Sequence, residues 1–483
     1  MRNDVELKVG LEIHFQLETE KKLFCNCSAC MKEKNPIKIV VRKLHPVQSE
    51  LGEIDKAAQF EYLRNRVFYY EIFENECCLV ELDEEPPHQP NEEAIKIALQ
   101  ISKLFNCKIP DEIHVMRKIV IDGSNTSGFQ RTMIVGFDGY FEFKGRKIPI
   151  TQVCLEEDAA AIDKEEDGKV YYKLNRLGIP LVEIDTGILE EFTPKEIEEI
   201  AYHIFLIASS TRKIRKTLGA IRQDVNVSIK GGNRVEIKGI QRLSMISKVI
   251  EKEVERQLSL IKEGKKVEKE TRVAKEDGST EFMRPLPGAE RMYPETDIKP
   301  IKTEIYLEKL EIPEPLTKII ERYKNEYKLT ESLIESLLKS DYFFLFDEIM
   351  KNFKIEGSIV ANILTSVIKD LERKEKIEFK LEKEKFFEFF EALEKKKIFK
   401  EAAYDILKEM YFNKELSVDE IVEKLNLKPL SKEEILKIIE ETRKEVKDEK
   451  KLINVIISKV RGRANIQEVI EILKAKNRQH EFP

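Results

Sequence analysis

The 483-residue sequence lacks several features that would place it in a common class of protein. It has no tryptophan, no apolar run long enough to cross a bilayer, and no apolar signal segment near its first residue. The net charge of −6 excludes a uniformly basic nucleic-acid binder, so contact with nucleic acid would need a local patch. The phosphate-binding loop Gly-x-x-x-x-Gly-Lys-Ser/Thr is also absent. We therefore expect a cytoplasmic protein with no membrane segment and no P-loop.

Cysteine is confined to the first third of the chain, where all seven residues lie at or before Cys154. An odd number that includes the adjacent pair Cys77 and Cys78 does not indicate a disulfide framework. One closer group could supply most of a tetrahedral zinc site: Cys25, Cys27 and Cys30. A fourth ligand would then come from His45, Cys77 or elsewhere. Three reduced thiols in a loop explain the spacing equally well.

Four short apolar stretches each carry two polar residues at positions i and i+2. The pairs are Glu12/His14, Glu183/Asp185, Asp224/Asn226 and Glu236/Lys238. Flanking Val, Ile and Leu favour strands, in which residues i and i+2 point to the same face. Each strand would then have one apolar face and one charged face. The pattern predicts a sheet with a charged, metal-binding concave surface; the alternative is an ordinary antiparallel sheet with solvated charges.

The chain changes character near residue 300. Before it, short apolar strands alternate with Gly-bearing turns and a few helices. After it, Lys-, Glu- and Leu-rich segments recur at helical period. We therefore expect a mixed α/β body at 1–300, a helical middle domain at 301–395 and a small helical tail domain at 396–483.

Local signals predict several helices within this plan. Thr193-Pro-Lys-Glu196 combines an N-cap hydroxyl, Pro at the first helical position and Glu at the third, so a helix should run through Ser209. Asn91 to Phe105 shows the apolar spacing of an amphipathic helix. Capping boxes at Ser417 and Ser431 predict two further helix starts.

Seven motifs together resemble one known family. They are, in chain order, Val9–His14, Glu81–His88, Asp122–Arg131, Leu155–Asp158, Leu177–Pro180, Ile221–Ser228 and Met283–Asp297. In this order they are similar to the GatB/GatE family, the E subunits of archaeal glutamyl-tRNA(Gln) amidotransferases and their bacterial B-subunit kin. The resemblance covers nearly the whole chain. One departure concerns an extra domain that E subunits carry after the segment equivalent to Glu255–Leu258; here Lys262–Lys265 leads almost directly into Glu270.

The resemblance implies a fold, a reaction and cofactors. The implied fold is α+β: a mixed or antiparallel-sheet catalytic cradle grouped with glutamine synthetase, an all-helical middle domain, and a small YqeY-like helical tail that binds tRNA. The implied reaction is ATP-dependent conversion of misacylated Glu-tRNA(Gln) to Gln-tRNA(Gln). ATP phosphorylates the glutamyl side chain, and ammonia displaces the phosphate. Clustered carboxylates suit this reaction, because phosphoryl transfer needs a divalent cation and Mg²⁺ prefers oxygen ligands.

The resemblance also implies the residues of the active site. The family's magnesium ligands carried over to this sequence are Glu12, His14, Glu157 and Glu183. In a strand, Glu156 and Asp158 would point away from Glu157. Nucleotide or phosphate contacts are assigned to Ser124, Asn125, Thr126, Ser127, Asp224, Asn226, Glu236 and Lys238. The alternatives are a simple turn at 124–127, an internal ion pair between Glu236 and Lys238, and, for Asp224 and Asn226, additional metal ligands or groups that hydrogen-bond to the ligands.

No machinery for releasing ammonia is evident in the sequence. No cysteine stands as a single nucleophile beside its base, and no Ser–Lys amidase pattern stands out. The resemblance therefore implies that ammonia comes from a partner, an asparaginase-like D subunit, in a heterotetramer of two D and two E subunits. An internal channel would deliver the ammonia.

The tail carries basic residues that the resemblance assigns to tRNA binding: Lys459, Arg461 and Arg463. Basic groups on short helices can contact phosphates without reading sequence. A solvated helix face is the alternative. Two other classes of function stay open, a non-catalytic tRNA-binding assembly protein and a metal-dependent hydrolase that needs no ATP.

Overall fold

A computed structural model describes residues 5–32, 35–48, 52–215, 217, 219–240, 242–288, 292–340, 342–446 and 449–480. Within the motif Met283–Asp297, residues 289–291 lie outside the described residues. Contacts divide the chain into two compact units, Met1–Thr317 and Lys318–Pro483. In the described part of the chain, no helix combines the length and apolar character that a membrane span requires.

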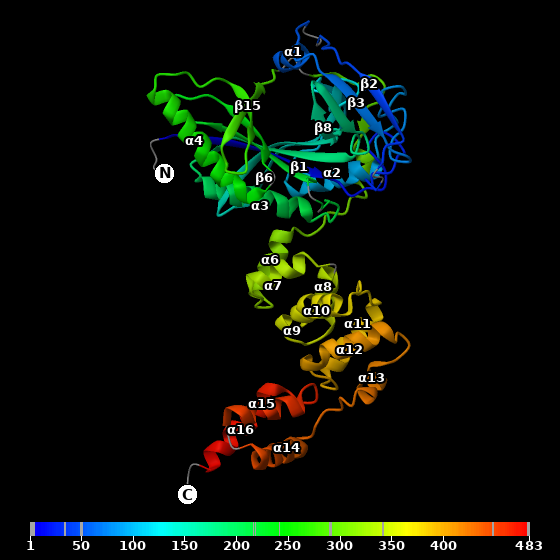
Figure 1. The fold of residues 1–483 in the computed structure, drawn as a ribbon, viewed down its shortest axis with the longest axis vertical. Helices are drawn as coiled ribbons and strands as arrows, with labels where there is room; N and C mark the ends of the chain where they lie inside the picture. The colour runs from blue at the N-terminus through cyan, green and yellow to red at the C-terminus, as the bar shows by residue number, and fades with distance from the viewer. Residues whose placement is uncertain are drawn as a thin grey trace. The chain divides into compact units, whose positions relative to one another are not determined.

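A large mixed sheet of eleven strands forms the centre of the first unit (Figure 1). The strand order is β15-β14-β13-β12-β1-β10-β7-β6-β5-β16, with β11 paired to β1. All neighbours on this path pair antiparallel except β13 and β14, which are parallel. The strands are β1 (Lys8–Gln16), β5 (Val115–Ile119), β6 (Phe129–Phe143), β7 (Arg146–Glu157), β10 (Pro180–Thr186), β11 (Leu189–Glu190), β12 (Ile221–Ser228), β13 (Val235–Ile240), β14 (Glu270–Ala274), β15 (Thr280–Pro285) and β16 (Met292–Pro294).

Helices cover one face of this sheet, where α2, α3 and α4 lie against the strands (Figure 1). Alternate residues of β1, among them Leu11 and Ile13, are buried in that interface. Burying one such side chain contributes about 1.5–3 kcal/mol. Gly136 lets α2 approach β6, because a Cβ there would lie 2.6 Å from the Cβ of Ser102. The opposite face of the sheet is left for polar side chains.

The helices of the first unit follow the sequence signals. The capping box of Thr193 and Glu196 is present at the start of α3, which confirms that prediction. Asn91 caps α2 by accepting hydrogen bonds from the N–H groups of Glu93 and Ala94. The helices are α1 (Lys56–Leu63), α2 (Glu92–Leu104), α3 (Pro194–Ser209), the 3₁₀ helix η1 (Leu243–Met245), α4 (Ile246–Lys262) and α5 (Glu304–Leu307).

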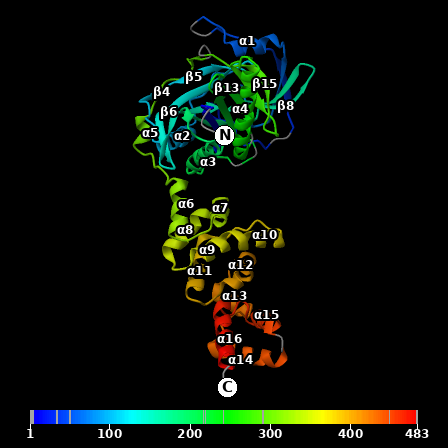
Figure 2. The same ribbon diagram turned by 90° about the vertical axis from the view of Figure 1, so that its left-hand side faces the viewer.

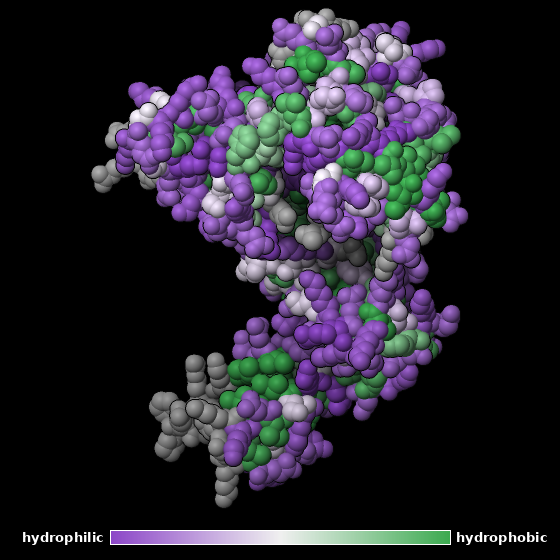
Figure 3. All heavy atoms as spheres, turned by 45° about the horizontal axis from the view of Figure 1, so that its top comes forward, coloured by the Kyte–Doolittle hydropathy of each residue, from purple (hydrophilic) through white to green (hydrophobic). Residues whose placement is uncertain are grey.

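Two smaller sheets complete the first unit. A four-stranded sheet has the order β2-β3-β9-β8, and its strands are β2 (Lys38–Arg42), β3 (Val67–Ile72), β8 (Ala161–Glu166) and β9 (Lys169–Lys173). A two-stranded sheet joins β4 (Glu112–Ile113) to β17 (Ile301–Lys302). Figure 3 shows that apolar side chains on the visible surface form separate patches among hydrophilic ones. Ile37, Ile39 and Val41 around β2 are among the exposed apolar residues.

The described part of the second unit is helical (Figure 2). Capping boxes at Ser417 and Ser431 are present, as predicted. The elements are α6 (Leu316–Asn325), α7 (Glu331–Leu338), α8 (Phe343–Asn352), α9 (Gly357–Asn362), the π-helix η3 (Ile363–Val367), α10 (Ile368–Glu375), α11 (Lys383–Glu394), the 3₁₀ helix η4 (Lys400–Ala402), α12 (Ala403–Phe412), α13 (Val418–Lys424), α14 (Lys432–Glu445), α15 (Glu449–Val460) and α16 (Ile466–His480). The α+β fold with a helical C-terminal region is thus confirmed, whereas a domain boundary at residue 395 stays a prediction.

Candidate active site

The polar residues of β1 and β10 meet on the face of the sheet that the helices leave open. In the antiparallel register, His14 stands opposite Glu183, and Glu12 stands opposite Asp185. Their strand neighbours Ile13 and Ile184 are fully buried on the helical side. Strand alternation therefore places the four polar side chains on one concave face.

A first group of ligand-type side chains forms around Glu183. His14 Nε2 lies 3.3 Å from Glu183 Oε1. Glu156, on the neighbouring strand β7, joins them, and one donor atom from each of the three residues lies within 4.8 Å of the others. Lys118 of β5 reaches over both carboxylates, with its Nζ 2.6 Å from Glu156 Oε1 and 3.6 Å from Glu183 Oε2.

A second group lies on β12 and β13, on the other side of Glu12. Oxygens of Glu12, Asp224 and Glu236 lie within 4.8 Å of one another. Lys238 contacts both of the outer carboxylates, and its Nζ is 2.8 Å from Glu236 Oε1. Asn226 Nδ2 donates to Glu12 Oε1 at 2.8 Å. Glu12 therefore lies between two pairs of carboxylates. One pair, Glu156 and Glu183, contacts Lys118, and the other, Asp224 and Glu236, contacts Lys238.

Burial and neighbouring charges shift the pKa values of the first group. Burial lowers the pKa of His14, but the Glu183 carboxylate outweighs it and raises that pKa to about 9. Burial, together with the charge of Glu183, raises the pKa of Glu156. Burial opposes ionisation of Glu183 as well, yet Lys118 and His14 hold its pKa well below the ordinary value. Glu156 and Glu183 thus bring negative charge together, and Lys118 and His14 offset that charge.

Two further observations fit a bound divalent cation. Burial, with the carboxylates of Glu183 and Glu12, raises the pKa of Asp185 well above its ordinary value. His14 Nδ1 and Asp185 Oδ1 are buried and have no hydrogen-bond partner among the described residues. Buried polar atoms without partners indicate a missing ion or water. Carboxylate oxygens suit Mg²⁺, whereas the imidazole suits Mn²⁺ or Zn²⁺ better.

An open pocket of about 400 Å³ adjoins this face. Sites for small molecules commonly have about 300–1,000 Å³. The residues around it include both carboxylates and cations: Glu12, Lys118, Asn226, Arg234 and Glu236. A nucleotide placed here would have its phosphates beside the ligand-type side chains.

Glu157 lies away from this face, so the four expected magnesium ligands do not form one group. Its strand neighbour Leu155 is fully buried in the core beneath the helices. Glu157 Oε1 accepts a hydrogen bond from the main-chain N–H of Arg131 at 2.9 Å and lies 3.5 Å from the Arg131 guanidinium. Burial raises the pKa of Glu157 and Arg131 opposes that shift. The structure places Glu156, not Glu157, beside His14 and Glu183.

The loop Ser124–Ser127 also lies away from the carboxylate groups. Asn125, Thr126, Ser127 and Glu157 line a separate small pocket of about 20 Å³. The loop's hydroxyl groups donate within the protein, Ser124 to the carboxylate of Asp122, Thr126 to the carbonyl of Glu81 and Ser127 to the carbonyl of Phe129. These contacts agree with a structural turn.

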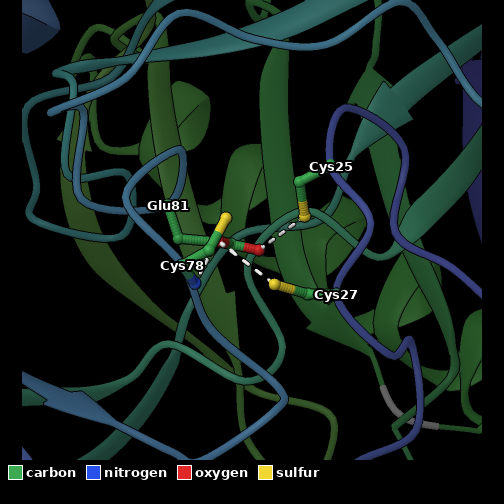
Figure 4. A group of neighbouring side chains, drawn as sticks. All are labelled: Cys25, Cys27, Cys78 and Glu81. Carbon is green, nitrogen blue, oxygen red and sulfur yellow. Dashed lines mark hydrogen bonds between the residues drawn. The ribbon is translucent and has the colours of Figure 1, made fainter.

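Three cysteines and a glutamate form a distinct cluster (Figure 4). One donor atom from each of Cys25, Cys27, Cys78 and Glu81 lies within 4.8 Å of the others. The Cys25 thiol donates to Glu81 Oε1 at 3.1 Å, and the main-chain N–H of Cys78 donates to Glu81 Oε2 at 2.8 Å. Cys30 is exposed and is not in this group. Hydrogen bonds from the thiols of Cys25 and Cys27 hold the pKa of Cys78 below its ordinary value.

The basic residues of the tail differ in their surroundings. Lys459 Nζ lies 3.0 Å from Glu445 Oε2, so an acidic neighbour already offsets its charge. Arg463 Nε donates to the carbonyl of Lys428 at 3.4 Å. Arg461, in the turn after α15, is exposed. Of the three expected tRNA contacts, Arg461 thus offers the most accessible charge.

The structure adds residues that sequence reasoning did not assign to the site: Lys118, Glu156, Cys78 and Glu81. Strand alternation places Glu156 on the same face as Cys154, and the structure adds that Cys154 stands opposite Glu183. No local pattern marked Lys118, whose strand is separated from β1 by three others in the sheet.

Comparisons with known proteins agree over nearly the whole chain. Residues 7–307 match the GatB/GatE catalytic domain, and residues 344–476 match the GatB domain. The chain is similar to three archaeal proteins, each named as the E subunit of a glutamyl-tRNA(Gln) amidotransferase. Identity is 37% for the protein of Methanocaldococcus jannaschii (98% of each chain covered), 35% for that of Pyrobaculum islandicum (96% of this chain, 97% of the relative) and 33% for that of Aeropyrum pernix (98% of each).

The lengths of these alignments show a difference in chain length. The alignment with the Methanocaldococcus jannaschii protein spans 620 positions, whereas this chain has 483 residues. The relative therefore contains sequence that has no counterpart here, in keeping with the missing extra domain.

Proposed function

Because the chain belongs to the GatB/GatE family, we propose that it is the transamidating component of a tRNA-dependent amidotransferase. ATP transfers its γ-phosphoryl group to the side-chain carboxylate of glutamate esterified to tRNA(Gln), and ADP leaves. Ammonia then attacks the activated acyl carbon, inorganic phosphate leaves, and Gln-tRNA(Gln) is formed. The convergence of buried carboxylates beside an open pocket on the concave face supports this proposal most strongly.

The residues that would hold Mg²⁺ are His14, Glu156 and Glu183, with Glu12 and Asp185 beside Glu183. When bound, the ion neutralises and aligns phosphate oxygens. Asn226 orients the carboxylate of Glu12 through its hydrogen bond. Arg234, at the pocket, offers a guanidinium group to phosphate oxygens.

Ammonia and tRNA binding involve further groups. We assign the source of ammonia to an asparaginase-like D subunit in an assembly of two D and two E subunits. Enclosed delivery would keep the ammonia unprotonated and prevent its loss to water. The tail binds tRNA phosphates through Arg461 and its basic neighbours.

We also assign a zinc ion to Cys25, Cys27, Cys78 and Glu81. Three thiolates and one carboxylate satisfy the four-coordinate tetrahedral preference of Zn²⁺. The close approach of three thiols and one carboxylate supports the assignment, because metal binding would release the protons that these groups share. The cluster would join the loop around Cys25 to the segment around Cys78, and its role would be structural.

The proposal is tested by incubating the purified chain with Glu-tRNA(Gln), ATP, Mg²⁺ and ammonium, followed by analysis of the amino acid on the tRNA. Formation of Gln-tRNA(Gln) is expected. A non-catalytic assembly protein would bind the tRNA but would show no Glu-tRNA-dependent ATP hydrolysis, and a hydrolase would act without ATP.

A further inference from the structure

Lys118 lies on the concave face and contacts two neighbouring carboxylates whose charges it neutralises. Its Nζ lies 2.6 Å from Glu156 and 3.6 Å from Glu183, two buried carboxylates that would otherwise repel each other. The Lys118 side chain is itself only 12% exposed. We propose that Lys118 is the counter-cation of these carboxylates in the metal-free protein, and that a divalent cation displaces its ammonium group onto the nucleotide phosphates. This inference rests on the proposed function.

The first step of the argument is competition for the same oxygens. Glu156 and Glu183 belong with His14 to the group whose donor atoms lie within 4.8 Å of one another. A divalent ion bound there would stand close to the ammonium group, and two cations so close repel each other. Because the carboxylates would hold the ion of higher charge more strongly, Lys118 would be the cation that leaves.

The second step concerns where the ammonium group can go. Lys118 also lines the open pocket of about 400 Å³ that contains Glu12, Asn226 and Arg234. A lysine side chain is a flexible four-carbon stem whose three donors rotate freely, so it can turn from carboxylate to phosphate without movement of β5. Phosphate oxygens form strong, charge-assisted hydrogen bonds with ammonium groups.

A second lysine on the concave face also contacts two carboxylates. On the other side of Glu12, Lys238 contacts Asp224 and Glu236 as Lys118 contacts Glu156 and Glu183. Each carboxylate pair is thus neutralised by one lysine whose charge a metal could replace. Lys118 is the better candidate for displacement because it lines the pocket directly.

The test separates metal binding from nucleotide binding. Mn²⁺ binding is measured by electron paramagnetic resonance without nucleotide, for the wild-type chain and for Lys118→Met. The variant should bind Mn²⁺ about tenfold more tightly, because a competing charge is removed. Binding of MgATP, measured by calorimetry, should weaken by a similar factor of about ten. The matched control is Lys164→Met, which removes a lysine that contacts a carboxylate outside the site.

A second experiment uses the wild-type chain, so it does not depend on the folding of a variant. Acetylation of lysines by a small reagent is followed by mass spectrometry for the free protein, the protein with Mn²⁺, and the protein with Mn²⁺ and ATP. Modification of Lys118 should be low in the free protein, several-fold higher with Mn²⁺, and low again with Mn²⁺ and ATP. Modification of Lys164 should be the same in all three conditions.

The outcomes distinguish the inference from the proposed function. If the wild-type chain binds no Mn²⁺, the metal site of the proposed function fails. If it binds Mn²⁺ but neither the affinity of Lys118→Met nor the modification of Lys118 changes, Lys118 is a fixed ion-pair partner and the inference is overturned. Weaker Mn²⁺ binding in a folded Lys118→Met variant would also overturn it.

Discussion

Glu156 and Glu157 are adjacent in the sequence, yet their carboxylates lie on opposite faces of β7. Glu156 meets Lys118 on the concave face, and Glu157 meets Arg131 on the other face. One dipeptide therefore contributes to two separate environments. The distinction is chemically important because only Glu156 shares a group with His14 and Glu183.

The first prediction compares the two glutamates. Glu156→Gln should reduce ATP-dependent phosphorylation of Glu-tRNA(Gln) by about 10²-fold or more, because an amide is a poorer magnesium ligand and carries no charge. Glu157→Gln should retain Mn²⁺ binding and lose about 1–3 kcal/mol of stability, since Arg131 would lose one charged partner. Phosphoryl transfer and Mn²⁺ affinity are the measurements. Equal loss of Mn²⁺ binding in both variants would contradict the assignment.

The second prediction concerns the nitrogen donor. The chain alone should convert Glu-tRNA(Gln) with ammonium but not with glutamine or asparagine, because no amide-hydrolysing nucleophile stands out in its sequence. Addition of an asparaginase-like D subunit should restore use of the amide donor. The amino acid released from the tRNA is analysed in each case. Amide-dependent conversion by the isolated chain would disprove this division of labour.

The third prediction tests the zinc cluster by comparing two cysteines. Cys78→Ser should abolish stoichiometric zinc, measured by elemental analysis, and lower the melting temperature, because it removes one of the four proposed ligands. Cys30→Ser is the matched control. It should keep the zinc content and the melting temperature of the wild type, since Cys30 is exposed and lies outside the cluster. Loss of zinc from the Cys30 variant would restore the ligand set expected from sequence.

The fourth prediction concerns the tail. Arg461→Gln should weaken tRNA binding and reduce the salt slope by about 1, the loss of one phosphate contact. Lys459→Gln should have a smaller effect because Glu445 already offsets that charge. Affinities are measured over a series of salt concentrations. Identical slopes in wild type and Arg461→Gln would identify the basic cluster as a solvated helix face.

The fifth prediction uses the buried carboxylate of Glu295. Burial opposes its ionisation, but Arg117 and Arg131 hold its pKa below the ordinary 4.5. Its stabilising effect is therefore fully present above pH 4.5 and is lost as pH falls through the native pKa. Glu295→Gln should cost roughly 3–5 kcal/mol at neutral pH. In urea unfolding, the difference in the free energy of unfolding between wild type and Glu295→Gln should become smaller below pH 4.5. The exposed Glu191→Gln is the control, with an expected change of at most about 0.5 kcal/mol.

Local patterns in the sequence were sufficient for much of the fold. The alternation of β1 placed Glu12 and His14 on the face opposite Ile13, and the Thr193 capping box marked the start of α3. Both signals are local: one depends on a two-residue period and the other on contacts within one helical turn.

The remaining features depend on contacts between distant segments. Cys78 and Glu81 reach Cys25 from about 50 residues away, through loops that carry no periodic signal. Lys118 comes from a strand that is not adjacent to β1. The choice of Glu157 over Glu156 followed the resemblance alone. The register of β7 with β10, which only the structure provides, is what places Glu156 on the site face.

The short loop 263–269 connects α4 to β14 at a point where the chain could be longer. It joins two elements of the crossover that makes β14 parallel to β13, and a Cβ added at Gly264 would meet no atom within 4 Å. A chain that carries a longer segment after α4 could thus accommodate it at the surface while the sheet register stayed intact. An insertion at Gly264 is therefore expected to leave the pairing of β13 with β14 intact.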